Sequence, residues 1–426
     1  MRPAISPKAR NLSVDSRATG RVIRDLRELA ELTSDEGGAQ RMCWTDTWDS
    51  ARKWLESKAL ELALSVSQDE AGNQWIVLPG NSESVLAIGG HLDSVANGGW
   101  LDGALNVLAG LDVLRRFAES GAKGVTLALV NWADEEGARF GRSLFGSSAA
   151  TGALDIAAVR RLIDESGVAL PDAVAAYGVD LDRVLESRSR LAPVKAYLEL
   201  HIEQGPVLES LDLPLGVVLG TCGVRRDVLR FIGQAAHAGP TPIANRRDAG
   251  IAGARFSLAL RECAIRHSGV ATVGTFRLEP GLPTIVPGAC ELIADMRHLD
   301  RLELSAMVDE MHATALWIAK EERVSVEWRP LVSAEPMAFD ETLIEICEGA
   351  ARDLGVLAPR MPSGALHDAT SMAAAGFPTA MIFVRSLGGL SHCAEEDSLE
   401  VDIDIAVETL HLATTRALES IAASTN

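Results

Sequence analysis

The sequence lacks paired cysteines. No two of its cysteines form a CxxC pair, although the chain has 426 residues. Disulfide scaffolds and cysteine-ligated zinc sites depend on close or regular cysteine spacing, so we expect neither. Isolated cysteines fit a reducing compartment, and we expect a cytoplasmic protein. The six positions are Cys43, Cys222, Cys263, Cys290, Cys347 and Cys393.

Positive charge and long apolar runs are also scarce. The chain has 40 Lys and Arg residues against 59 Asp and Glu residues, which gives a formal net charge of −19. This balance repels the phosphates of nucleic acids and anionic membrane surfaces, so neither partner is expected. No run of about 18 apolar residues occurs, although a membrane-spanning helix needs one. The remaining composition is that of an ordinary globular protein.

The length is large for a single core and predicts two domains. Apolar runs at residues 85–89 and 125–131 predict buried strands, and helical spacing at 104–118 predicts a helix between them. This order is typical of an α/β layer, a mixed central sheet with flanking helices, in which functional loops follow the carboxyl ends of strands. Residues 196–203 alternate, which predicts a strand with one apolar face and one polar face, with His201 on the polar face.

A different pattern occupies residues 222–331. Strands at 226–233, 272–278, 290–297 and 324–330, with helices at 246–266 and 302–321, give the order β-α-β-β-α-β. This is the ferredoxin-like split motif. The α/β pattern then resumes, with helices at 341–354, 369–375 and 402–422 and a strand at 379–384. We therefore expect a discontinuous catalytic domain, residues 1–221 and 332–426, interrupted by an inserted domain, residues 222–331.

Five short segments carry the candidate chemistry. They are HLD at residues 91–93, GWLDG at 99–103, DEEG at 134–137, ELHIEQG at 199–205 and SH at 391–392. Together they supply three histidines, an isolated aspartate and a glutamate pair, which are ligands that zinc, manganese or cobalt ions accept. The set predicts a dinuclear metal site, in which a carboxylate bridges two ions about 3.5–4 Å apart.

The members of this set have different expected roles. Asp102 is the expected bridge, because its glycine-rich loop lets the backbone approach the ions. Asp93, two residues from His91, can fix the tautomer of that imidazole. Glu135 is the expected general base for an attacking water. The other ligands form two pairs, His91 with His201 and Glu136 with His392.

Each feature alone has a simpler explanation. A His-x-Asp triplet is weak evidence, an acidic pair is usually solvated, and a helical histidine such as His312 or His411 more often packs. The conjunction of five segments at strand ends favours the metal site. A metal-free ligand-binding protein would have lost ligand positions, and a structural dimerisation protein leaves the clustered histidines and glutamates unexplained.

Longer stretches around these segments resemble a known family. They read GGHLDSV at residues 89–95, GGWLDGA at 98–104, DEEGARF at 134–140, ELHIEQGP at 199–206 and HAGPTP at 237–242. They resemble the hydantoinase/carbamoylase family of amidohydrolases, within the aminoacylase and zinc-carboxypeptidase superfamily. Its members include N-carbamoyl-L-amino acid hydrolases, allantoate amidohydrolase and β-ureidopropionase. The resemblance extends from about residue 20 to about residue 420.

The resemblance implies the metal ligands named above, two divalent ions (Zn, Mn, Co or Ni) and Glu135 as general base. It also implies a homodimer formed through the inserted domain, which serves as a lid and dimerisation domain. The histidine matching His237 would reach the partner's active site and stabilise the oxyanion. From the residues alone, His237 is an ordinary histidine before a rigid GPTP turn.

Four residues are expected to bind substrate. Gln204 matches a contact to the carbamoyl or ureido end, and Arg297 matches an arginine that grips the substrate carboxylate, which a planar guanidinium can do with two parallel bonds. Thr284 departs from the family, which usually has asparagine there; a hydroxyl lacks the paired donor and acceptor of an amide. His367, in GALHDA at 364–369, can contact substrate or cap a helix.

The expected function is therefore metal-dependent hydrolysis of a linear C–N bond, carbamoyl, ureido or amide, in a small carboxylate-bearing substrate such as an N-carbamoyl-L-amino acid. An N-acyl amino acid deacylase or a dipeptidase on the same scaffold is the nearest alternative.

Overall fold

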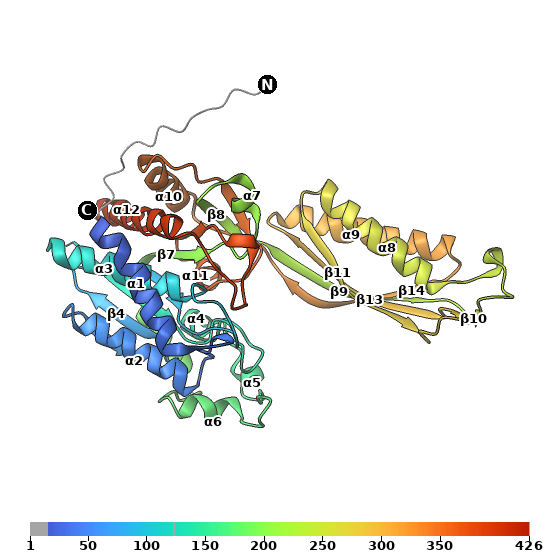
Figure 1. Ribbon diagram of the computed structural model, residues 1–426, viewed down its shortest axis with the longest axis horizontal. Coiled ribbons are helices and arrows are strands. Elements are labelled where there is room, and N and C mark those ends of the chain that lie inside the picture. The colour runs from blue at the N-terminus through green and yellow to red at the C-terminus, as the bar shows by residue number, and fades with distance from the viewer. Residues whose placement is uncertain (1–15, 122–123, 426) are drawn as a thin grey trace, which may run out of the picture. The chain divides into compact units, whose positions relative to one another are not determined.

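The structure is a computed structural model that describes residues 16–121 and 124–425. The chain divides into two compact units (Figure 1). Unit 1 comprises Met1–Leu219, Phe339–Met361 and Leu366–Asn426, and unit 2 comprises Gly220–Ala338 and Pro362–Ala365. Residues 1–15, with which the expected catalytic domain begins, lie outside the described residues.

A mixed sheet forms the centre of unit 1, in the strand order β8-β17-β7-β5-β6-β4-β3. The strands β17, β7, β5 and β6 are parallel, while β8, β4 and β3 are antiparallel to their neighbours. This confirms the predicted α/β class with a mixed central sheet. The bounds are β3 Ser65–Gln68, β4 Gln74–Leu78, β5 Ser82–His91, β6 Val125–Trp132, β7 Val194–Ile202, β8 Leu215–Thr221 and β17 Thr379–Val384.

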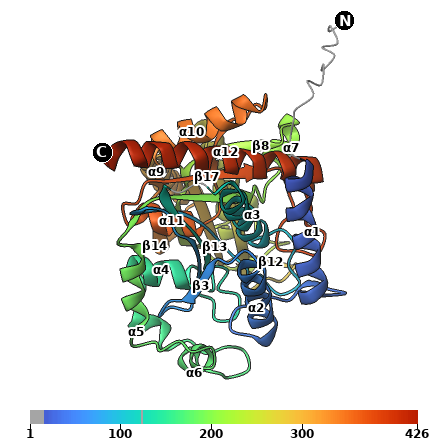
Figure 2. The same cartoon turned by 90° about the vertical axis from the view of Figure 1, so that its left-hand side faces the viewer.

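Helices pack against this sheet in two groups (Figure 2). In one group α1, α3 and α12 contact one another, α10 packs on α12, and α3 and α12 contact the central strands. In the other group, α4 and α11 contact each other and the sheet. Every residue of β17 is buried, so helices cover both of its faces. The bounds are α1 Ser16–Thr33, α3 Ala104–Ser120, α4 Phe145–Thr151, α10 Glu341–Asp353, α11 Asp368–Ala374 and α12 Glu400–Thr425.

Shorter elements fill the connections of unit 1. The helix α2 begins after Thr45, whose side chain accepts a hydrogen bond from the Trp48 amide as an N-cap. The elements are β1 Ser34–Asp35, β2 Gly38–Ala39, α2 Asp46–Leu60, α5 Ile156–Val159, α6 Leu170–Ala175, η1 Val184–Leu191, α7 Val207–Leu211, β16 Arg360–Ser363 and η3 Leu387–Gly389.

The strand β7 differs from its predicted two-faced character. It lies between β17 and β5, and every residue from Ala196 to Ile202 is buried. The polar side chains of Glu199 and His201 therefore enter the protein interior, where each needs a polar partner or a cation.

Unit 2 has its own sheet, in the strand order β11-β13-β9-β14, with every pair antiparallel. Its elements follow the chain order β9-α8-β11-β13-α9-β14, as the sequence predicted. Phe231, Phe256, Leu292 and Met307 belong to a core that the two helices form with the sheet. The bounds are β9 Gly223–Ile232, β10 Ala236–His237, η2 Ile243–Asn245, α8 Ala249–Arg266, β11 Val270–Glu279, β12 Ile285–Val286, β13 Ala289–His298, α9 Arg301–Glu321, β14 Ser325–Ala334 and β15 Met337–Ala338.

The helix α8 begins three residues later than predicted. Asp248 is its N-cap, and the carboxylate accepts hydrogen bonds from the amides of Gly250 and Ile251. Among residues 16–121 and 124–425, no helix combines the length and apolar character that crossing a bilayer requires.

Candidate metal centre

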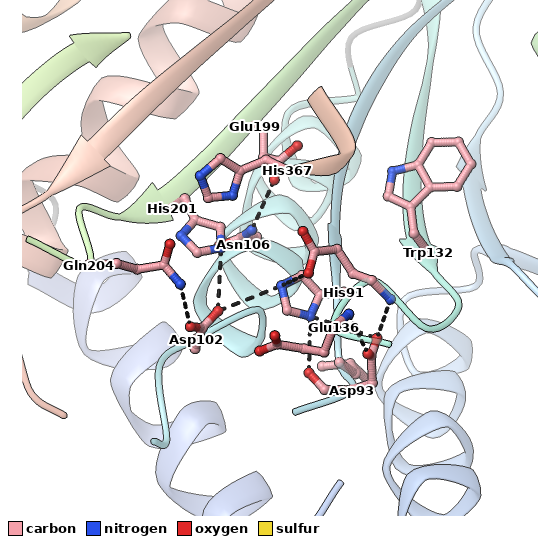
Figure 3. A network of polar contacts seen from close by, with 12 residues as sticks. His91, Asp93, Asp102, Asn106, Trp132, Glu136, Glu199, His201, Gln204 and His367 are labelled. Carbon is pink, nitrogen blue, oxygen red and sulfur yellow. Dashed lines mark hydrogen bonds and ion pairs between the residues drawn. The ribbon is translucent and has the colours of Figure 1, made fainter. Parts of the chain in front are cut away.

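The candidate ligands of unit 1 gather at the carboxyl ends of its parallel strands. His91 is the last residue of β5, His201 lies near the end of β7, and Glu136 lies in the turn after β6. Figure 3 shows their side chains pointing toward Asp102, which precedes α3. A Cβ atom on Gly103, where φ is +69°, would lie 2.4 Å from the carbonyl oxygen of His91, so glycine lets α3 begin beside that strand end.

Two histidines converge on one oxygen of Asp102. His91 Nε2 lies 3.6 Å and His201 Nε2 lies 3.4 Å from Asp102 Oδ1. His91 Nδ1 lies 3.0 Å from the main-chain carbonyl oxygen of Asp93. His201 Nδ1 lies 2.9 Å from the main-chain carbonyl oxygen of Ile202. A carbonyl only accepts, so Nδ1 carries a proton in each ring, and in the neutral form of the ring Nε2 offers a lone pair on the side of Asp102. We call these three side chains the first group.

The other oxygen of Asp102 faces a second group, formed with Glu136 and His392. His392 Nε2 lies 3.5 Å from Asp102 Oδ2 and 3.4 Å from Glu136 Oε2. Asp102 thus presents one oxygen to each group, as a bridging carboxylate does. The side chain of His392 is 48% exposed, whereas that of His201 is 1% exposed, so the second group is much closer to solvent.

The first group fits a divalent cation. Asp102 Oδ1 and His91 Nε2 are buried and have no hydrogen-bond partner among the described residues. Both atoms are electron-pair donors, so they repel each other unless a cation lies between them. Two ligand atoms about 2.1 Å from one ion at a tetrahedral angle lie about 3.4 Å apart. The observed separations of 3.6 and 3.4 Å agree with that arrangement.

Buried carboxylates make the centre strongly attractive to cations. Burial raises the pKa of Glu136 to about 10, and the charge of Asp102 adds to this effect. Burial also raises the pKa of Glu135 well above its usual range. For Asp102, burial opposes ionisation, but positive charge on the facing histidines, when these are protonated, outweighs it and lowers its pKa to about 2. A cation beside neutral rings would act in the same direction. Divalent ions offset the repulsion that otherwise keeps such carboxylates protonated.

The turn after β6 sends adjacent glutamates to different groups. Glu135 Oε2 lies 3.8 Å from His91 Nε2, while Glu136 faces the second group. The carboxylate of Asp93 accepts hydrogen bonds from the Glu135 amide at 3.3 Å and the Glu136 amide at 3.1 Å. Asp134, before them, has a left-handed φ of +57°. Asp93 thus orients His91 through its main-chain carbonyl, and its side chain holds the glutamate turn instead.

Gln204 and His367 lie at the same centre. Gln204 Nε2 donates to Asp102 Oδ2 at 2.8 Å and to Ser391 Oγ at 3.2 Å. His367 is the N-cap residue of α11, and its buried ring lies 4.3 Å from that of His201 between centroids. Burial lowers the pKa of His367 well below its usual range, so the ring is neutral.

Three of the predicted site residues lie in unit 2. The exposed His237 ends β10, and its Nδ1 accepts the amide proton of the residue two positions later at 3.1 Å. The carbonyl of Thr284 accepts the amide proton of the residue after His237 at 2.8 Å, so both belong to one paired segment. Arg297 donates to Asp295 Oδ1 at 2.8 Å and to the carbonyl of Gly364 at 2.6 Å.

The sequence did not indicate a role for Glu199, although this residue begins the ELHIEQG segment. Its Oε2 accepts hydrogen bonds from Tyr197 Oη and from the Ala369 amide, both at 2.9 Å. It forms a further candidate ligand group with His201 and His367. Burial raises the pKa of Glu199 to about 8. The available signal was its position two residues before His201 on one strand face.

Arg41 carried no signal in the sequence at all. Its side chain is fully buried, and Nε donates to the carbonyl of Leu92 at 2.7 Å, directly after His91. Its Nη2 has no hydrogen-bond partner among the described residues. Arg41 lies 50 residues earlier in the chain than His91, so only the fold brings this cation behind the strand end.

The sequence is similar to known proteins over most of its length. The sequence model of the Peptidase family M20/M25/M40 matches residues 87–416. An N-carbamoyl-L-amino acid amidohydrolase of Geobacillus stearothermophilus is 36% identical, covering 92% of this chain and 96% of that protein. An allantoate amidohydrolase of Bacillus subtilis is 32% identical, and the match covers 88% of this chain and 92% of that protein.

Solved structures agree with the fold. The crystal structure of an amidase of the hydantoinase/carbamoylase family from Burkholderia multivorans superposes with a TM-score of 0.87 at 30% identity. The match covers 94% of this chain and 98% of that one.

Proposed function

Because the chain belongs to the Peptidase family M20/M25/M40, we propose that it hydrolyses a linear carbon–nitrogen bond in a small carboxylate-bearing substrate. The resemblance to hydantoinase/carbamoylase enzymes seen in the sequence is confirmed by these relatives. The substrate we favour is an N-carbamoyl-L-amino acid or a similar ureido acid. The observation that carries the proposal is the carboxylate of Asp102, which presents one oxygen to each of two groups of metal-ligand type.

The centre is proposed to hold two divalent ions of zinc, manganese, cobalt or nickel. The first would be held by His91, Asp102 and His201, and the second by Asp102, Glu136 and His392. When bound, such ions lower the pKa of water and polarise a carbonyl group.

The residues of the chain then perform the proton transfers. Glu135, buried beside His91, is proposed to take a proton from the attacking water and pass it to the leaving nitrogen. Its neighbour Glu136 is turned to the second group, which leaves Glu135 for this role. Gln204 is proposed to bind the carbamoyl or ureido end, since its amide oxygen is buried without a partner among the described residues.

Unit 2 is proposed to act as a ferredoxin-like lid and dimerisation domain. Its helix α8 exposes Ile251, Leu258 and Ile265 at intervals of seven residues, an apolar stripe that a second copy can cover. Arg297 would grip the substrate carboxylate, and His237 would stabilise the oxyanion in the site of the partner subunit. A cytoplasmic location also remains a proposal, supported by six free cysteines.

A metal-reconstituted activity screen tests the substrate class. The panel contains N-carbamoyl, ureido, amidino and N-acetyl amino acids together with dipeptides. Turnover of N-carbamoyl or ureido acids supports the proposal. Preferential turnover of N-acetyl amino acids or dipeptides would support the alternative, a deacylase or dipeptidase on the same scaffold. Two observations favour testing this alternative: Thr284 replaces the usual asparagine, and the matching family is a peptidase family. A chain without bound metal and without turnover would be a ligand-binding relative.

Graded chelation is expected to remove the two ions in sequence. The second group loses its ion first, because His392 is 48% exposed while His91 and His201 are 1% exposed. Metal analysis after dialysis against increasing chelator should therefore pass through a plateau at one ion per chain. A single step from two ions to none would contradict this difference between the groups.

Replacing Thr284 by asparagine is expected to raise kcat/KM for N-carbamoyl substrates roughly threefold to tenfold, because an amide adds one well-placed hydrogen bond. The measurement is steady-state kinetics on N-carbamoyl and N-acetyl forms of one amino acid. Ser268→Asn, an exposed hydroxyl-to-amide change in unit 2, is the matched control. A drop in kcat/KM would show that the native substrate needs the smaller hydroxyl.

A further inference from the structure

Glu396 is a buried carboxylate that contacts the backbone of the bridging residue. It is 1% exposed, and its Oε1 accepts hydrogen bonds from the amides of Leu101 at 3.1 Å and Asp102 at 2.8 Å. These two amides belong to the loop that delivers Asp102 to the centre. Glu396 itself lies four residues after His392, on the loop that forms the second group.

A serine connects the same two loops. Ser391, next to His392, has its hydroxyl 2.9 Å from Asp102 Oδ2 and 3.2 Å from Glu396 Oε2. This hydroxyl has one proton and donates to one carboxylate at a time, but it lies within hydrogen-bond distance of both Asp102 and Glu396, in addition to the two amide bonds. The loop of Asp102 and the loop of His392 are therefore connected by hydrogen bonds from main-chain amides to Glu396 and by side-chain contacts of Ser391.

Gly99 leaves the space that this contact requires. A Cβ atom on Gly99 would lie 2.1 Å from Glu396 Oε1 and 2.2 Å from its Cδ, so any side chain there would displace the carboxylate. Glycine at this position is explained by the close approach of Glu396. The GWLDG segment therefore contains a residue whose role is set by a side chain about 300 residues later in the chain.

We propose that Glu396 is a positioning residue that fixes Asp102 as the bridge and assembles the second group. The inference rests on the proposed dinuclear site. The first group takes its histidines from strands of the central sheet, which hold them in place. The second group depends on loops: His392 is half-exposed and has a left-handed φ of +60°. Loosening the contact to Glu396 should therefore weaken the second ion more than the first.

The test is isothermal titration of the metal-stripped full-length chain with Mn²⁺. For E396A, we expect the tighter ion, which shares Asp102 but keeps both strand histidines, to lose at most about threefold in affinity. The weaker ion should bind roughly 10- to 100-fold less tightly, the usual effect of losing a residue that orients a ligand. For E396Q, we expect near-wild-type binding of both ions, because the amide oxygen can accept both amide protons and the NH₂ group can donate to Ser391. G99A should reproduce the loss seen with E396A.

The matched control is E408A, which removes a buried carboxylate of α12 that pairs with Arg116 at 2.7 Å. It should leave the binding of both ions unchanged. If E396A fails to fold, G99A and E396Q decide the question.

Wild-type affinity for both ions in E396A or in G99A, or equal weakening of both ions, would overturn the positioning role. Loss of the weaker ion in E396Q would also overturn the positioning role. E396Q keeps the hydrogen bonds to the Asp102 loop, so such a loss would show that Glu396 acts through its negative charge. A wild-type chain that binds no Mn²⁺ would overturn the proposed function itself, and this inference with it.

Discussion

Replacing Glu135 by glutamine is expected to lower kcat by roughly 100- to 10,000-fold, the usual contribution of a general acid–base group. The amide cannot take a proton from water, but it keeps the size of the side chain. Glu135 Oε2 lies 3.8 Å from His91 Nε2, and Glu135 belongs to neither of the two ligand groups, so both ions should remain bound. Steady-state kinetics and metal analysis of the purified variant check both parts.

The neighbouring residue offers a matched comparison. Glu136→Gln changes the same chemical group one position later, but Glu136 Oε2 faces His392 at 3.4 Å in the second group. This variant should lose one ion as well as activity. If Glu135→Gln also loses an ion, Glu135 is a ligand; if it keeps full activity, the base is another residue.

The sequence predicted the strand ends of the centre because apolar runs mark buried strands and polar residues beside glycine mark their ends. That information is local. It was insufficient for β7, where alternation predicted a polar face. The helices α3, α11 and α12 pack against β7, and the side chains of both faces are buried. It also did not say which oxygen of Asp93 contacts His91. In the structure the main-chain carbonyl makes this contact, a choice that depends on local backbone geometry.

Residues that act from a distance along the chain were missed. Arg41 and Glu396 lie about 50 and 300 residues from the segments they contact, and neither carries a motif. Pro362–Ala365 belongs to unit 2, although it was expected in the catalytic domain. The carbonyl of Ser363 accepts the amide proton of Cys222 at 2.9 Å, and that of Gly364 accepts a bond from Arg297. A segment of four residues has no periodicity from which such pairing can be read.

The role of His237 leads to the second prediction with a large expected effect. His237→Ala should lower kcat by roughly 100- to 1,000-fold, the usual cost of removing one oxyanion donor, while metal content stays unchanged. His237 is exposed and lies in unit 2, so its loss should leave the fold intact. His312→Ala on α9, also an exposed histidine of unit 2, is the matched control and should keep wild-type activity.

A hybrid dimer shows which subunit supplies the imidazole. One chain carries Glu135→Gln and the other His237→Ala, with different affinity tags so that only the mixed dimer is purified. If His237 acts in the partner's site, one of the two sites in the hybrid combines an intact Glu135 with an intact His237. The hybrid should then recover about half of the wild-type activity, although both parent dimers are nearly inactive, because a twofold dimer has two equivalent sites. If His237 acts within its own chain, no site in the hybrid is complete, and activity stays at the level of the parents. Failure to recover any mixed dimer after co-expression would instead contradict the proposed homodimer.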